Sequence, residues 1–150
     1  VPHDDAENVA VIACDSNGKR AAVVTDLGEV TAELISHLKN CNHISIEANY
    51  DHDRLMRGGY PDSLKRRVSG RGGHLSNYQT AKALQEIVHP ELHSIVLCHL
   101  SESNNLPHIA ESEVLMGICD SFDGSLSISK QEGPDFSNWI GQSNPERIVA

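Results

Sequence analysis

The sequence predicts a mixed α/β domain, because short apolar runs typical of buried strands alternate with segments of helical periodicity. The clearest strand is Ser94–Cys98, a β-branched and mainly apolar run of the kind that is buried on both faces of a sheet. The segment before it, residues 75–88, places Leu75, Leu84 and Ile87 near one face at a period of 3.6 residues. Together these two segments predict a helix that packs on the sheet and leads into a core strand.

The remaining elements follow from the same patterns. Residues 15–19 contain Asn17-Gly18, a strong hairpin signal, so we expect the first two strands to form a hairpin. The expected strands lie at residues 8–14, 20–25, 43–47, 94–98 and, at an edge, 125–129. The expected helices lie at residues 30–39, 75–88 and 104–116, with two short helices between Glu47 and His74. We expect the helices on one face of the sheet and an apolar surface on the other.

The composition is that of an ordinary soluble globular protein. At 150 residues, with 39% hydrophobic residues, the chain is long enough for one domain with its own core. Its apolar runs are far shorter than the ~20 residues that a bilayer requires, so no membrane contact is expected. The four cysteines are widely separated and form no Cys-x-x-Cys pair. This spacing favours reduced thiols in a cytoplasmic protein over a disulfide framework or a zinc knuckle.

Charge is unevenly distributed along the chain. The net charge of −9 argues against bulk electrostatic attraction to nucleic acid. However, four of the twelve lysines and arginines fall close together, at Lys65, Arg66, Arg67 and Arg71. This basic run is either the solvated face of a helix or a set of phosphate contacts, and the sequence leaves both interpretations open.

Side chains suited to catalysis occur at the ends of three expected strands. Glu47 ends one strand, and Asp26 and His99 directly follow two others, while His74 lies on a glycine loop ahead of a helix. Active sites of α/β folds are commonly found at such strand ends and loops, so these four residues form the candidate site. Taken alone, Asp26 also fits a simple turn with Gly28.

Several short motifs within residues 2–107 occur in the order found in one known family. They are Pro2-His3-Asp4, Val24-Thr25-Asp26-Leu27-Gly28, Ile46-Glu47-Ala48-Asn49-Tyr50-Asp51, Gly59-Tyr60-Pro61 with Leu64-Lys65-x-Arg67, Gly73-His74-Leu75-Ser76-Asn77 and His99-Leu100-Ser101-Glu102-x-Asn104-Asn105. The last two are the most specific. On these residues the chain resembles the carboxy-terminal half of YycJ/WalJ-type metallo-β-lactamase-fold hydrolases, relatives of tRNase Z and of the β-CASP nucleases.

The resemblance implies a role for each candidate residue. His3 resembles the third metal-binding motif of the family, Asp26 its bridging aspartate and His99 its last histidine ligand. Glu47 and His74 resemble the acid–imidazole pair beside the metals in the tRNase Z branch. The implied cofactor is a pair of divalent ions, which could be zinc, manganese or iron, and the implied reaction is phosphodiester hydrolysis of DNA or RNA. The basic run would then contact substrate phosphates.

The chain departs from the family pattern in one respect. The His-x-His-x-Asp-His motif that supplies most of the first metal site is absent, and no His-x-His occurs in the sequence. The chain also begins with Val rather than Met, so we expect it to be truncated at its amino end. We therefore expect residues 1–130 to form the second half of an αββα sandwich, with residues 131–150 a loosely ordered tail, and the exposed half-domain face to favour self-association. Two alternatives stay open: a non-catalytic interaction module, and a small-molecule ester or thioester hydrolase.

Overall fold

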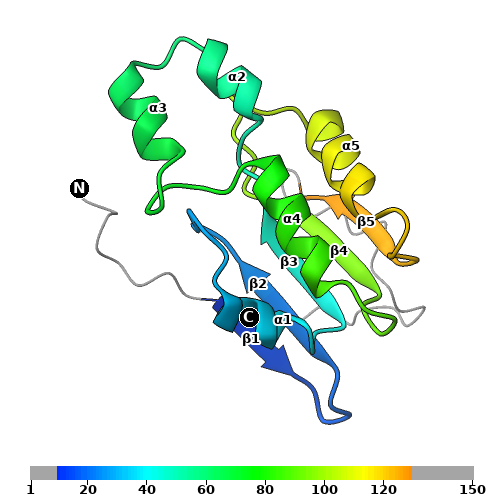
Figure 1. The fold of residues 1–150 in the computed structure, drawn as a ribbon. Coiled ribbons are helices and arrows are strands. Elements are labelled where there is room, and N and C mark those ends of the chain that lie inside the picture. Colours follow the sequence, from blue (N-terminus) through cyan, green and yellow to red (C-terminus); the bar gives the residue numbers. More distant parts are fainter. Residues whose placement is uncertain (1–9, 130–150) are drawn as a thin grey trace, which may run out of the picture.

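The computed structural model describes residues 10–129, and its centre is a five-stranded mixed sheet (Figure 1). Along the sheet the strands follow their order in the sequence, with β1 antiparallel to β2 and every later pair parallel. The strands are β1 (Ala10–Cys14), β2 (Arg20–Val24), β3 (His43–Glu47), β4 (Ser94–Cys98) and β5 (Ser125–Ile128). Since β2, β3 and β4 are parallel, their carboxyl ends lie at one edge of the sheet. The expected α/β class and mixed sheet are confirmed, whereas the predicted tail lies outside the described residues.

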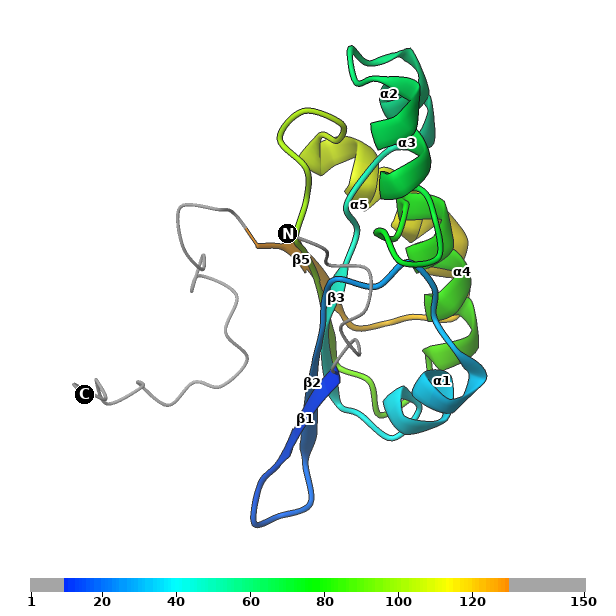
Figure 2. The same cartoon turned by 90° about the vertical axis from the view of Figure 1, so that its left-hand side faces the viewer.

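The helices are α1 (Ala32–Leu38), α2 (His52–Arg57), α3 (Asp62–Val68), α4 (Asn77–Ile87) and α5 (Pro107–Ile118). As Figure 2 shows, α1, α4 and α5 cover the same face of the sheet, while α2 and α3 extend beyond the carboxyl ends of the strands. Among the helices of residues 10–129, none combines the length and apolarity that spanning a bilayer would require.

The core lies between the sheet and the helices. It is built from fully buried aliphatic side chains of the central strands and of the two longest helices, chiefly Ile44, Ile46, Ile95, Leu97, Leu84, Ile87, Val114 and Ile118. Local signals place the elements correctly: Ser76 and Gln79 form a capping box at the start of α4, and Pro107 is in the first turn of α5. The Asn17-Gly18 turn is confirmed as well, with Gly18 at φ 82° between β1 and β2.

The face of the sheet that no described helix covers is only partly apolar (Figure 2). Val11 and Val23 pair in register and are 60% and 51% exposed. Further along the same row Val23 pairs with Ser45, Ser45 with Val96, and Val96 with Ser127. From β2 to β5 valines therefore alternate with serines, so this surface is more polar than the sequence led us to expect.

Two loops meet at the carboxyl end of the sheet through a glycine contact. A Cβ at Gly28 would overlap the main-chain carbonyl groups of Gly70 and Arg71. The same loops are joined by the Arg71 guanidinium, whose Nε and Nη2 atoms donate to Glu29 at 2.6 and 2.8 Å. The first loop contains Asp26 and the second leads to His74, so this contact sets how closely those two residues approach.

We expect Gly28→Ala to lower the free energy of unfolding by about 1–3 kcal/mol, because the added methyl group pushes two backbone segments apart. Urea denaturation would measure the change. Gly72→Ala is the matched control, since a Cβ at Gly72 has nothing within 4 Å. Equal free energies for the two variants would contradict the proposed contact.

Candidate functional site

Four residues predicted from the sequence come together at the carboxyl end of the sheet. Glu47 ends β3, while Asp26 and His99 follow β2 and β4, the two strands that flank it. His74 approaches from the loop before α4, where its ring centroid is 5.2 Å from that of His99. We refer to Asp26, Glu47, His74 and His99 as the Asp/Glu/His cluster.

The buried carboxylate of Glu47 is at the centre of the cluster. Its side chain is 0% exposed, and its Oε1 atom lies 2.6 Å from Nδ1 of His74 and 3.3 Å from Nδ1 of His99. The Oε2 atom accepts a hydrogen bond of 2.9 Å from the main-chain N–H of Leu27, the residue next to Asp26. One carboxylate therefore contacts both imidazoles and the backbone beside the aspartate. When each Nδ1 donates to Glu47, each Nε2 is left with a free lone pair.

Backbone conformation at two strand ends is unusual. Asp26 has φ 60° and His99 has φ 56°, both in the left-handed region that residues other than glycine seldom adopt. Such residues cost of order 1–3 kcal/mol and persist where the surrounding structure holds them, most often at functional sites. Here the two left-handed residues face each other, with His99 Nε2 3.6 Å from Asp26 Oδ1.

The cluster contains a donor set suited to a divalent metal ion. One ligand atom each from Asp26, His74 and His99 lies within 4.8 Å of the others. Two imidazoles and one carboxylate are the donors that zinc, manganese and iron accept in proteins. A carboxylate that hydrogen-bonds the far nitrogen of a ligating histidine is the usual support for such a site, and Glu47 has this position for both rings.

The same contacts shift two pKa values in opposite directions. Burial alone would raise the pKa of Glu47, but hydrogen bonds from His74, His99 and the Leu27 N–H outweigh it, so that this pKa is lowered. The hydrogen bond to Glu47 raises the pKa of His99 above its ordinary value of 6.5, against the opposing effect of burial. Glu47 is therefore an anion at neutral pH in spite of its burial.

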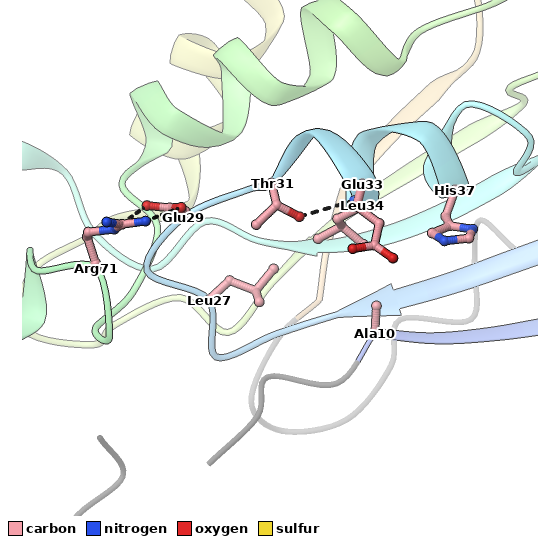
Figure 3. A pocket seen from close by; sticks show the side chains of 8 residues that line it. All are labelled: Ala10, Leu27, Glu29, Thr31, Glu33, Leu34, His37 and Arg71. Carbon is pink, nitrogen blue, oxygen red and sulfur yellow. Dashed lines mark hydrogen bonds and ion pairs between the residues drawn. The ribbon is translucent and has the colours of Figure 1, made fainter. Parts of the chain in front are cut away.

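The basic run is divided among different contacts. Lys65, Arg66 and Arg67 lie in the last turn of α3. Lys65 Nζ donates to the main-chain carbonyl of Met56 at 2.6 Å, which ties α3 to α2. Arg71 is paired with Glu29, and this pair borders a cavity of about 370 Å³ between the start of α1 and residues near β1 (Figure 3). The cavity is lined by Leu27, Glu29 and Arg71 among others, and none of the four cluster residues lines it.

Two kinds of residue complete the comparison with the sequence. His3, the expected third-motif ligand, lies outside the described residues. Asn49, Asn77 and Asn105 are buried side chains that link the loops of the cluster, and no part in the site was predicted for them. All three asparagines lie inside the quoted motifs, and this position was the signal that could have identified them. Buried amides require hydrogen-bond partners, so asparagines at these positions are candidates for linking neighbouring loops.

The fold and the cluster define a mixed α/β protein with a His/Asp group able to hold a divalent metal ion. No family model matches the sequence. Over 114 residues the chain is 35% identical to the exodeoxyribonuclease YycJ of Bacillus anthracis, a match that covers 76% of this chain and 43% of the relative. Over 92 residues it is 35% identical to the exodeoxyribonuclease WalJ of Streptococcus pneumoniae strain D39, covering 61% of this chain and 34% of that protein.

The chain is thus homologous to the YycJ and WalJ exodeoxyribonucleases over most of its length, and the resemblance expected from the motifs is confirmed. It spans less than half the length of these relatives.

We expect Glu47→Gln to lower the free energy of unfolding at pH 7 by about 1–3 kcal/mol, because an amide cannot accept from all three donors at once. A group whose folded pKa is lowered stabilises the fold above its unfolded pKa, and this contribution is lost as pH falls through the folded value. The difference between wild type and variant should therefore shrink as the pH is lowered below about 4. Urea denaturation of the metal-free protein across pH would measure it. A difference that does not change with pH would contradict the anionic Glu47.

Proposed function

We propose that this chain contributes to a metal-dependent phosphodiesterase, a nuclease that acts on DNA. The observation that supports it most is the hydrogen bonding of both imidazoles to one buried carboxylate beside Asp26. The choice of DNA rests on homology to the exodeoxyribonucleases, with RNA as the second substrate class. A small-molecule ester or thioester would be the remaining substrate within the same fold.

Asp26 and His99 are the residues we assign to metal binding, together with His3 from the third motif. Two divalent ions of zinc, manganese or iron would be held, and Asp26 could serve both because a carboxylate has two oxygens. When bound, such ions lower the pKa of a water molecule and supply hydroxide near neutral pH. Carboxylate and imidazole are donors that these ions accept, and Asp26 and His99 present one ligand atom each within 4.8 Å of one another.

His74 is the residue we assign to proton transfer, with Glu47 as its partner. The 2.6 Å contact between Glu47 Oε1 and His74 Nδ1 fixes the ring and leaves Nε2 directed away from the carboxylate. When both ring nitrogens are protonated, His74 can deliver the Nε2 proton to the departing oxygen of the cleaved phosphodiester, and the ring is left neutral with Nδ1 still donating to Glu47. Lys65, Arg66, Arg67 and Arg71 would contact phosphates along the strand, although Lys65 and Arg71 must first release their protein partners.

The architecture we propose for the complete enzyme is an αββα sandwich of the metallo-β-lactamase type in the cytoplasm. The helix-free face of the sheet, with its alternating valines and serines, suits close packing against a second sheet. Residues 1–130 would be the carboxy-terminal half, and residues 131–150 its tail. The His-x-His-x-Asp-His motif of the proposed enzyme would come from outside these 150 residues, which contain no His-x-His.

One observation favours a second candidate function. The 150 residues contain no His-x-His, so by themselves they offer few metal ligands. The chain alone would then be a non-catalytic half-domain that associates with a partner or with itself through the helix-free sheet face. The coding sequence upstream of Val1 separates this function from the first, because an in-frame His-x-His-x-Asp-His motif there would supply the further metal ligands that an enzyme needs.

The assigned roles of Asp26 and His74 predict different outcomes of substitution in the full-length protein that carries this chain. Asp26→Ala should reduce bound metal and phosphodiester hydrolysis together, because it removes the carboxylate placed between the ions. His74→Ala should retain metal and lose about 10²–10⁴-fold in turnover, as expected for a proton donor. Elemental analysis and hydrolysis of a bis-phosphodiester reporter would measure both quantities.

A loss of metal in His74→Ala as complete as in Asp26→Ala would make His74 a ligand instead. Its distance from Asp26 and His99 is compatible with that role. His52→Ala is a suitable control, because His52 lies at the start of α2, outside the cluster.

The basic run predicts a salt-dependent effect on DNA binding. Arg66→Ala should weaken binding and reduce the slope of log affinity against log salt by about one unit, the value for one lost phosphate contact. Lys39→Ala is the control, since Lys39 caps the carboxyl end of α1. Fluorescence anisotropy with a labelled oligonucleotide at several salt concentrations would measure the slope. An unchanged slope would return this residue to the solvated-face interpretation.

A further inference from the structure

Asn49 forms a hydrogen bond with the main chain of His99. It lies two residues after Glu47 and is buried, at 8% exposed. Its side-chain Nδ2 donates to the main-chain carbonyl of His99 at 2.8 Å. Its main-chain carbonyl accepts from the main-chain N–H of Ser101 at 2.8 Å. Two hydrogen bonds from one residue therefore hold the segment from His99 to Ser101.

This segment needs such support because His99 has a left-handed backbone. At φ 56° the residue lies outside the broad regions that side-chain-bearing residues adopt, and an extended backbone would aim the ring differently. In this conformation the ring lies 3.3 Å from Glu47 and 3.6 Å from Asp26. The distance of 3.3 Å to Glu47 is long for a hydrogen bond, whereas His74 Nδ1 lies 2.6 Å from the same carboxylate. The orientation of the His99 ring therefore depends more on its backbone conformation than that of His74 does.

A reciprocal amide pair holds Asn49 in turn. Nδ2 of Asn77 donates to Oδ1 of Asn105 at 3.1 Å, and Nδ2 of Asn105 donates to Oδ1 of Asn77 at 2.8 Å. Asn105 Nδ2 also donates to the carbonyls of Ala48 and Asn49, at 2.8 and 3.1 Å. Asn77 follows His74 by three residues and Asn105 follows His99 by six, so the pair joins both histidine segments to the loop after β3.

We propose that Asn49 is a positioning residue for His99, which keeps the ring Nε2 directed at Asp26 by holding the left-handed backbone, with Asn77 and Asn105 fixing Asn49. Since the purpose of this orientation is metal binding, the proposal rests on the proposed function. Asn49 itself acts through the main chain of His99 and has no assigned contact with metal or substrate.

Asn49→Ala and Asn42→Ala form a matched pair for the test. Asn42 lies at the opposite end of β3, is 9% exposed, and bridges backbone groups in the same way: Oδ1 accepts from the Arg20 N–H and Nδ2 donates to the Glu91 carbonyl. Zinc affinity of the full-length protein, by competition with a chromophoric chelator, should fall about 10-fold or more in Asn49→Ala only. Equal affinities in the two variants would overturn the proposal.

A second measurement requires no metal. In ¹H–¹⁵N spectra of the metal-free protein at fixed pH, Asn49→Ala should remove or broaden the Nδ1–H signal of His99 and leave that of His74. Asn42→Ala should keep both signals, and an unaltered His99 signal in Asn49→Ala would overturn the proposal. If the wild type binds no zinc, the proposed function fails while these spectra still decide the role of Asn49. Asn49→Ser, too short to reach the His99 carbonyl, replaces Asn49→Ala in both measurements if the alanine variant does not fold.

Discussion

The arrangement of the site depends on one buried carboxylate. Glu47 is fully excluded from solvent, and an isolated charge in that position would be strongly unfavourable. Three donors offset the cost: the two imidazoles and the Leu27 N–H. Each donor belongs to a different loop at the carboxyl end of the sheet. The charge of Glu47 is thus stable only when all three loops are in place, and this requirement couples folding of the sheet edge to assembly of the cluster.

Most of the fold and part of the site followed from the sequence. Apolar runs and turn residues predicted the five strands and five helices of residues 10–129 to within a few residues, because local patterns determine them. The meeting of Asp26, Glu47 and His99 followed from strand direction, since parallel neighbours end at the same edge. The second hydrogen bond of Glu47, to His99, could not be predicted, as it depends on the left-handed backbone at that residue.

The clustering of four cations in the basic run does not predict what each of them contacts. Their clustering in the sequence suggests that the four cations form one surface. In the structure, however, Lys65 donates to the main-chain carbonyl of Met56, nine positions away, and Arg71 pairs with Glu29, 42 positions away. Neither partner could be identified from spacing, because both contacts follow from how the loops pack. The Glu29–Arg71 pair joins the Asp26 and His74 loops, so its role is in assembling the site edge. Because both groups are exposed, screening by solvent makes the contribution of this pair to stability small.

The three loops are specified by polar contacts rather than by apolar packing. Hydrophobic burial fixes the sheet and its helices, but it is not directional and cannot select a left-handed residue at the end of a strand. Amides can, because each donor and acceptor has a required direction. The Thr80 hydroxyl shows the same principle: it donates to the carbonyl of Glu47 at 2.6 Å and so links α4 to the end of β3. The motifs therefore contain asparagine and threonine beside histidine and acid, since the orientation of the imidazoles depends on backbone that these side chains hold.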